Sequence, residues 1–273
     1  MELKHIRSKI KISLAEYFYR SRFKRQARLY CIGTAKSGTH SIASMFTDSL
    51  RSGHEPDNGL NIQKILRLKD KEGSDSSMSN YLRKRDRKLC LDVDSSQLNF
   101  YLLKYLIPEF SDARFLLTIR DCYSWLDSLM NDSLRRTAND VWISFREYRF
   151  RADLFSHSQE EQILKDRGLY TLDGYLSYWS MHNSIVLKSV PKSKLMVVRT
   201  DEITQKATEI AEFCGLPTTS IEFQKTHSFK NPRKFNILRE INQNYLEDKV
   251  SEHCGNLMRT VFPEIKSIDD SGI

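Results

Sequence analysis

The segment GTAKSGTHS, residues 33–41, constrains the fold more than any other part of the chain. It follows a short apolar run, LYCIG, and leads into residues 39–50, where apolar residues recur at helical spacing: Ile42, Met45, Phe46 and Leu50. Strand, glycine-containing loop and helix together form a generic anion-binding unit, because backbone N–H groups at the helix start point at the anion. The sequence therefore predicts a phosphate- or sulfate-binding turn after the first strand.

Strand and helix signals alternate from Leu29 onward, which is typical of a parallel sheet flanked by helices. Further strands are predicted at 88–93, 114–119 and 194–200, a long loop at 53–80, and helices through 134–190. We therefore expect an α/β, P-loop-like fold with three layers, a central mainly parallel sheet and helical insertions. Residues 29–273 are predicted to form a single domain that closes with a loop and helix after residue 227.

The 273-residue chain has a net charge of +8, which favours anionic partners without choosing among them. Residues 1–28 form a basic, helix-like extension that could bind a membrane surface or polyanion, although a docked helix with a solvated basic face is the simpler interpretation. The sequence has neither a transmembrane run nor an aromatic-interleaved basic motif for nucleic acid. Five cysteines without CxxC spacing favour a reducing compartment, so we expect a cytoplasmic protein.

The predicted loop differs from the loop that binds nucleotide triphosphates. Gly33 and Gly38 permit tight turns, Lys36 adds a positive charge, and Ser37, Thr39 and Ser41 add hydroxyl groups. In a triphosphate loop, lysine directly follows the second glycine and precedes a magnesium-binding Ser or Thr. Here Gly38 is followed by Thr39 and His40. This difference disfavours a kinase or ATPase, which remains a less favoured alternative.

A second anion site is predicted from TIRDCYSWLDS. Arg120 ends the strongest predicted strand, and Ser128 lies two helical turns farther along the chain. Ligands of open α/β sheets bind at the carboxyl ends of strands, where an arginine can donate two hydrogen bonds to a phosphate. The alternative is a surface ion pair between Arg120 and Asp121 or Asp127.

With both motifs in view, the chain resembles sulfotransferases that use 3′-phosphoadenosine 5′-phosphosulfate (PAPS) and release 3′-phosphoadenosine 5′-phosphate (PAP). AKSGTHS is similar to their 5′-phosphosulfate loop, Arg120 with Ser128 to their 3′-phosphate pair, and LMVVRTDEI with AEFCGLP to a later strand and helix. The resemblance covers residues 29–217. It implies that the 5′-phosphosulfate is held by Lys36, Ser37, Gly38, Thr39, His40 and Ser41.

The resemblance also implies that Arg120 and Ser128 hold the 3′-phosphate, joined by a basic residue of SFKNPRK, for which we favour Arg233. No metal is required. Many family members carry tryptophan at the position of Ser41 for stacking on adenine, so adenine would stack elsewhere, on Tyr178 or Trp179, unless those rings pack in the core.

Sulfuryl transfer requires a base that deprotonates the acceptor and a cation that stabilises the leaving phosphate, a role we assign to Lys36. His54 and Glu55 follow the first helix, in a region where the resembling family places its base. Asp92 and Asp94 are predicted at the end of the second strand, on one face. We rank Glu55 first, then His54, Asp94 and Asp92. Loop capping and an ordinary surface histidine are the alternatives.

The acceptor is constrained only by charge. Glu55, Asp57, Asp92 and Asp94 are expected to crowd the acceptor side, which suits a neutral or cationic small molecule. The local sequence also resembles bacterial cytosolic sulfotransferases that modify natural products, for which a saxitoxin-type guanidinium alkaloid is one possible acceptor. The alternative is a carbohydrate or lipid-linked glycan.

Overall fold

Five short parallel strands form the centre of the molecule. The computed structural model describes residues 24–70, 74–226 and 234–273. The strands lie in the order β2-β3-β1-β4-β5. Their bounds are β1 Leu29–Cys31, β2 Ser52–His54, β3 Val93–Ser95, β4 Arg114–Ile119 and β5 Leu195–Arg199. The predicted α/β class with a parallel central sheet is confirmed.

The central strand β1 determines which loops meet. Leu29 pairs with Val93 of β3 on one side and with Arg114 of β4 on the other. Since all five strands run in the same direction, the segments after β1, β2 and β4 emerge at one edge of the sheet. Residues 33–38, 54–55 and 120 are therefore neighbours although they are far apart in the sequence.

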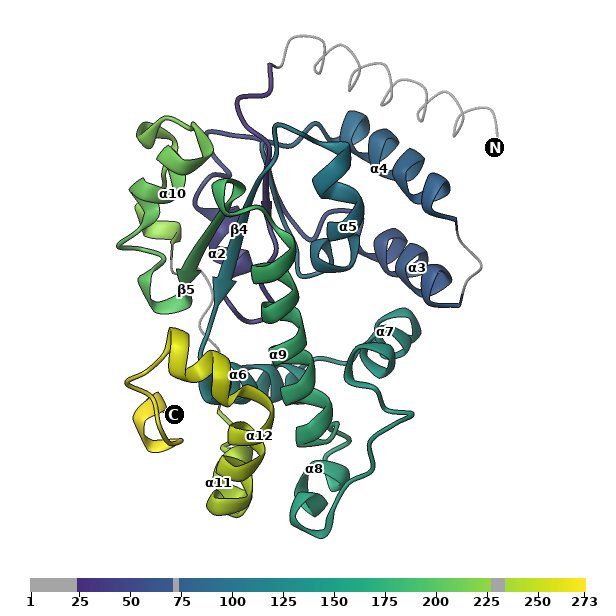
Figure 1. Cartoon of the computed structure of the whole chain (residues 1–273), viewed down its shortest axis with the longest axis vertical. Coiled ribbons are helices and arrows are strands. Elements are labelled where there is room, and N and C mark those ends of the chain that lie inside the picture. Colours follow the sequence, from purple (N-terminus) through teal and green to yellow (C-terminus); the bar gives the residue numbers. More distant parts are fainter. Residues whose placement is uncertain (1–23, 71–73, 227–233) are drawn as a thin grey trace, which may run out of the picture.

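Helices cover both faces of the sheet (Figure 1). Leu29 and Cys31 pack in the same apolar cluster as residues of α2 and α10, whereas Tyr30 and Ile32 pack on the opposite face with residues of α3, α4 and α5. This alternation follows from the two-residue period of a strand and requires an apolar layer on each side. The helices are α2 Thr39–Ser44, α10 Ala207–Cys214, α3 Asn58–Lys69, α4 Asp75–Leu89 and α5 Asn99–Glu109.

A third group of helices lies beyond the carboxyl ends of β4 and β5 (Figure 1). It consists of α6 Cys122–Arg135, α7 Asp140–Phe150, α8 Gln162–Asp166, α9 Leu172–Ser189, α11 Ile237–Glu240 and α12 Gln243–Val261. Trp125, Trp179 and Leu246 belong to its buried apolar cluster. The helical character predicted for 134–190, and the helix predicted after residue 227, are confirmed.

Three sequence predictions of local structure are wrong. Residues 88–93 are not a strand, because α4 continues to Leu89 and β3 begins only at Val93. Residues 53–80 contain β2, α3 and the start of α4 in place of a long loop. The helix predicted from 39 to 50 is regular only to Ser44, although the four apolar residues that predicted it are all buried.

The N-terminal extension lies mostly outside the described residues, which begin at 24, so its predicted helix stays a prediction. Where the description begins, Arg25 forms an ion pair with Asp86 of α4 (2.9 Å). In the part of the chain that is described, no helix combines the length and apolar character needed to cross a membrane.

Candidate functional site

The loop between β1 and α2 is packed so closely that two of its residues must be glycine. A Cβ atom on Gly33 would lie 2.5 Å from the carbonyl oxygen of Thr118 in β4. A Cβ atom on Gly38 would lie 2.4 Å from Ile203 Cδ1, and φ is +101° at this residue. Lys36 also has a positive φ, of +67°, a backbone conformation that is uncommon for a non-glycine residue and clusters at functional sites.

Side chains from three other elements fasten this loop by its carbonyl groups. The hydrogen bonds run from Trp125 Nε1 to Ala35 (2.8 Å), from Thr200 Oγ1 to Ser37 (2.7 Å) and from Ser95 Oγ to Thr39 (2.6 Å). Within the described part of the chain, no side chain caps the start of α2. With its acceptors occupied and the first-turn N–H groups of α2 uncapped, the loop is suited to an anion.

The Ser37 hydroxyl has a structural role within the loop. The hydroxyl donates to the Thr34 carbonyl (2.7 Å), and its oxygen lies 3.0 Å from Thr118 Oγ1. The residue is fully buried. The hydroxyl therefore braces the loop against β4 in this arrangement, so that Ser37 would have to act on an anion through other atoms.

Arg120 lies at the carboxyl end of β4, where hydrogen bonds fix its backbone and its Nε atom. Its Nε donates to Ser124 Oγ (2.9 Å), and its carbonyl accepts from Trp179 Nε1 (3.0 Å). Asp121 caps α6 and accepts from the Ser124 N–H (2.9 Å). Among the described residues, the two terminal nitrogens of Arg120 make no hydrogen bond or ion pair. The alternative ion pair with Asp121 or Asp127 is therefore not formed.

Ser128 lies one helical turn beyond Ser124 on the same face of α6, and its hydroxyl makes no hydrogen bond within the described parts of the chain. Burial lowers the pKa of Arg120, although Asp121 and Asp127 act in the opposite direction. A half-buried cation that is not paired with a described carboxylate gains most from an incoming anion, because its own hydration is already reduced.

Lys36 lies beside a carboxylate at the end of α6. Its Nζ is 3.3 Å from Asp132 Oδ1, which is also 3.3 Å from Arg135 Nη2 and 3.4 Å from Arg136 Nε. Partial burial lowers the pKa of Lys36, and Asp132 acts in the opposite direction. Three cations around one carboxylate leave a positive excess, which suits an anion that approaches the loop.

His54 ends β2 directly beside the loop. Its Nε2 lies 3.3 Å from Thr39 Oγ1, and its ring is 5.0 Å from that of His40. His54 keeps an exposed face, but desolvation of its ring, with His40 and Lys36 nearby, lowers its pKa to about 4. The imidazole is therefore neutral at neutral pH, and it is a weak base.

Glu55 follows with a strained backbone, φ +50°, and its N–H donates to the Ser95 carbonyl (2.9 Å). Its Oε1 accepts from Gln97 Nε2 (2.6 Å). Burial raises the pKa of Glu55, and the hydrogen bond from Gln97 partly offsets this effect. A carboxylate with a raised pKa is the stronger base of the two.

Asp92 and Asp94 do not join this group. Asp92 precedes β3 and therefore lies at the opposite edge of the sheet, where it accepts from the backbone N–H of Gln26 (2.6 Å) and Arg51 (3.2 Å). Asp94 is buried in an ion pair with Arg85 (2.5 Å). Both were predicted at a strand end because the apolar residues of 88–93 suggest a strand, whereas β3 begins only at Val93.

The predicted adenine-stacking rings and the predicted third basic residue at the 3′-phosphate have different outcomes. Tyr178 and Trp179 are buried in the core under α6, so neither ring offers a free face for stacking. Arg233 lies outside the described residues, and its assignment stays a prediction.

Comparison with known proteins identifies the family. A family profile described as "Sulfotransferase domain" matches residues 28–231. The chain belongs to the sulfotransferase family. Sulfotransferase STF9 from Mycobacterium avium has a similar structure, with 12% identity, a TM-score of 0.50, and coverage of 94% of this chain and 82% of that one. A sulfotransferase from Alicyclobacillus acidocaldarius matches with 13% identity, a TM-score of 0.44, and coverage of 86% and 95%. No curated protein sequence matches significantly.

This sulfotransferase brings residues 33–41, His54, Glu55, Arg120 and Ser128 to one edge of the sheet. Asp132 was not predicted from the sequence, although Ser124, Ser128 and Asp132 recur every four residues and so share a face of α6. Neither were Gln97 and Arg149, whose Nη1 donates to Gln97 Oε1. No sequence pattern marks these two, because their contact depends on how α7 packs.

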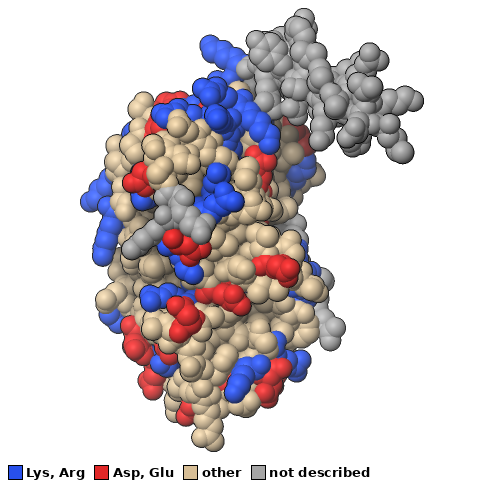
Figure 2. Space-filling view, turned by 90° about the vertical axis from the view of Figure 1, so that its right-hand side faces the viewer, with Lys and Arg blue, Asp and Glu red and all other residues tan. Residues whose placement is uncertain are grey.

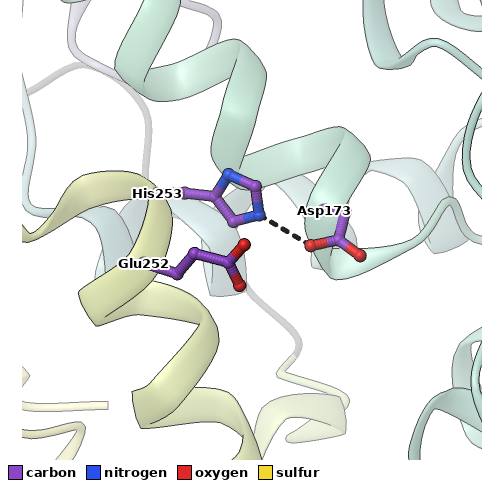
Figure 3. A group of neighbouring side chains, drawn as sticks. All are labelled: Asp173, Glu252 and His253. Carbon is purple, nitrogen blue, oxygen red and sulfur yellow. Dashed lines mark hydrogen bonds and ion pairs between the residues drawn. The ribbon is translucent and has the colours of Figure 1, made fainter.

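A separate cluster of possible metal ligands joins α9 to α12 (Figure 3). Ligand atoms of Asp173, Glu252 and His253 lie within 4.8 Å of one another. However, Asp173 Oδ1 already accepts from His253 Nε2 (2.6 Å) and Lys249 Nζ (2.8 Å). Although burial acts against ionisation, these hydrogen bonds lower the pKa of Asp173. The cluster thus fastens α12 to the sulfotransferase core without need of a cation.

Proposed function

We propose that this sulfotransferase transfers the sulfuryl group of PAPS to a hydroxyl or nitrogen of a small acceptor, as an enzyme of the EC 2.8.2 type. One observation carries the proposal: the loop after β1 and the terminal nitrogens of Arg120 after β4, which make no hydrogen bond with any described residue, lie at the ends of two paired strands. Two anion-binding elements on adjacent strands suit a nucleotide that carries separate 5′ and 3′ anionic groups.

Each element of the site would have one task. The loop, with Lys36, Ser37, Gly38, Thr39, His40 and Ser41, would hold the 5′-phosphosulfate, while Arg120 and Ser128, joined by Arg233, would hold the 3′-phosphate. PAPS supplies an activated sulfuryl group whose S–O bond to the 5′-phosphate breaks as the acceptor attacks. Lys36 would then stabilise the negative charge that develops on the leaving phosphate. The proposed chemistry requires no metal ion.

We propose Glu55 as the base that takes the proton from the acceptor, with His54 as the alternative. The raised pKa of Glu55 makes it a stronger base than His54, whose pKa is about 4. Asp92 and Asp94 would serve the fold, since the first binds backbone N–H groups and the second is paired with Arg85.

The charges around the base favour an acceptor that carries an anionic group. With Asp92 and Asp94 committed elsewhere and Asp57 paired with Lys88 (3.2 Å), only Glu55 remains of the four carboxylates that favoured a cationic acceptor, such as a guanidinium alkaloid. Arg146 lies one turn before Arg149 on α7, within electrostatic reach of Asp132, and makes no hydrogen bond or ion pair with any described residue. Arg146, with Arg135 and Arg136 beside Asp132, also supports a sulfated or otherwise acidic glycan as the second candidate acceptor.

The proposed compartment and partners rest on the cysteines and on the distribution of surface charge. All five cysteines are free thiols, which fits a reducing compartment, and we propose the cytoplasm. On the face drawn in Figure 2, basic side chains gather near the top, while basic and acidic side chains mix lower down. This mixture does not favour a nucleic-acid or membrane-binding module over an enzyme.

The test is a sulfotransfer assay by mass spectrometry, with PAPS and three acceptor classes: hydroxybenzoates, sulfated oligosaccharides, and amino or guanidino alcohols. We expect PAP and a sulfated product with one of the acidic classes, and strongly reduced product with Lys36→Ala. Sulfation of the cationic class alone would refute the proposed acceptor charge. ATP-dependent phosphorylation without sulfation would refute the proposed reaction.

A further inference from the structure

A chain of buried polar groups extends from Glu55 into the core. Gln97 Nε2 donates to Glu55 Oε1 (2.6 Å), and Arg149 Nη1 donates to Gln97 Oε1. Gln97 and Arg149 are only 6% and 5% exposed. The orientation of the Gln97 amide is fixed, because a flipped amide would place its N–H groups against the guanidinium and its oxygen against the carboxylate. The amide therefore links a buried cation to the proposed base.

Arg149 has no carboxylate of its own. Within the described ranges it forms no ion pair, and its guanidinium lies over the rings of Phe145, Phe150 and Tyr178 at 5.3, 4.4 and 5.3 Å. A buried cation is costly unless it is compensated. The aromatic faces offset part of the cost of burying this charge. The hydrogen bond through Gln97 couples the charge of Arg149 to the carboxylate of Glu55.

The same chain reaches the anion-binding loop. Tyr178 Oη donates to His182 Nδ1 (3.1 Å), and His182 Nε2 donates to the Ile32 carbonyl (2.8 Å), one residue before Gly33. Burial lowers the pKa of His182 to about 3, so the ring is neutral and carries its proton on Nε2. The groups behind Glu55 and the start of the loop are therefore parts of one packed network.

We propose that Gln97 and Arg149 are positioning residues that hold the Glu55 side chain in one orientation and keep it ionised within its partly buried site. This inference rests on the proposed function, because it concerns how the base of that reaction is prepared. Without such a network, a buried carboxyl group retains its proton and cannot accept one from the acceptor.

The environment of Glu55 both raises and lowers the pKa of its carboxyl group. Burial is the largest influence and raises the pKa of Glu55, and Asp132 of α6 adds to this rise. The hydrogen bond from Gln97, the charge of Arg149 and the charge of Arg136 lower it. His54, the preceding residue, is neutral at neutral pH, so the Gln97–Arg149 pair is the principal support for the charged form of Glu55 among the described residues.

The test measures the ionisation of Glu55 without any acceptor. Protein carrying 13C in its glutamate side-chain carboxyls is titrated by NMR, and Glu55→Gln identifies the resonance. We expect Gln97→Met, which keeps the volume and removes the amide, to raise the Glu55 midpoint by about one to two pH units. Gln162→Met is the matched control, because it removes an exposed glutamine–aspartate hydrogen bond elsewhere.

Arg149 provides a second, independent variant. Arg149→Met is expected to raise the Glu55 midpoint as well, whereas Arg149→Lys retains the charge and is expected to shift it less. Circular dichroism confirms that each variant is folded. A Glu55 midpoint that is the same in the native protein and in folded Gln97→Met or Arg149→Met overturns the inference.

The proposed function can fail separately from this inference. The same native sample is tested for thermal stabilisation by PAP. Absence of stabilisation counts against the PAPS reaction, while the titration still decides whether Gln97 and Arg149 control the ionisation of Glu55.

Discussion

Substitution of Arg120 by alanine tests the proposed 3′-phosphate contact of the nucleotide site. Ser124 holds Nε, so the two terminal nitrogens are the groups that remain for a phosphate. A hydrogen bond to a charged group contributes about 1.5–3 kcal/mol. Since about 1.4 kcal/mol changes an equilibrium constant tenfold, loss of even one such bond predicts PAP binding that is about 10- to 100-fold weaker.

Isothermal titration calorimetry with PAP and AMP separates the 3′-phosphate from the rest of the nucleotide. Arg120→Ala should weaken PAP and leave AMP, which lacks that phosphate, nearly unchanged. Arg114→Ala is the matched control, because Arg114 begins the same strand and is about 20 Å away at about 3.3 Å per residue. Equal weakening of PAP and AMP, or PAP binding that survives Arg120→Ala, would refute the assignment.

Three further changes test the supporting structure. Gly33→Ala places a methyl group 2.5 Å from the backbone oxygen of Thr118, so urea unfolding should show a loss of about 1–3 kcal/mol, together with weaker PAP binding. Asp94→Asn breaks the buried ion pair with Arg85 and should cost about 3–5 kcal/mol of stability, while kcat of the folded enzyme stays near native; a selective loss of kcat would instead make Asp94 a base. His182 has a pKa of about 3 when folded against about 6.5 unfolded, so the unfolded chain binds the proton first and the free energy of unfolding should fall by up to about 1.4 kcal/mol per pH unit below pH 6.5. His182→Gln should flatten this dependence in urea titrations at pH 7, 6 and 5, and an unchanged slope would contradict the assigned neutral ring.

The anion-binding elements could be predicted from the sequence because they rest on local rules. Gly33 and Gly38 are required by close approach and by positive φ, which short motifs encode. Arg120 ends a strand of six residues whose apolar run is easily recognised. Both sites depend on a strand, the turn after it and little else.

The residues around the proposed base were predicted less accurately than the anion-binding elements, because their contacts depend on the packing of elements that are distant in the sequence. The strand β3 was predicted too early in the chain, since the apolar residues of 88–93 resemble a strand while α4 in fact continues to Leu89. That shift assigned Asp92 to the wrong edge of the sheet. The contact between Arg149 and Gln97 joins residues 52 positions apart, and no local spacing marks it.

The central claim is that the two anion-binding elements form one site for a 3′-phosphoadenosine nucleotide. The most direct measurement is the thermal shift of the native protein with PAP, compared with ATP and magnesium. We predict clear stabilisation by PAP and little by ATP with magnesium, because Gly38 is followed by Thr39 and His40 in place of a lysine and a magnesium-binding Ser or Thr. Stabilisation by ATP with magnesium alone would contradict the account.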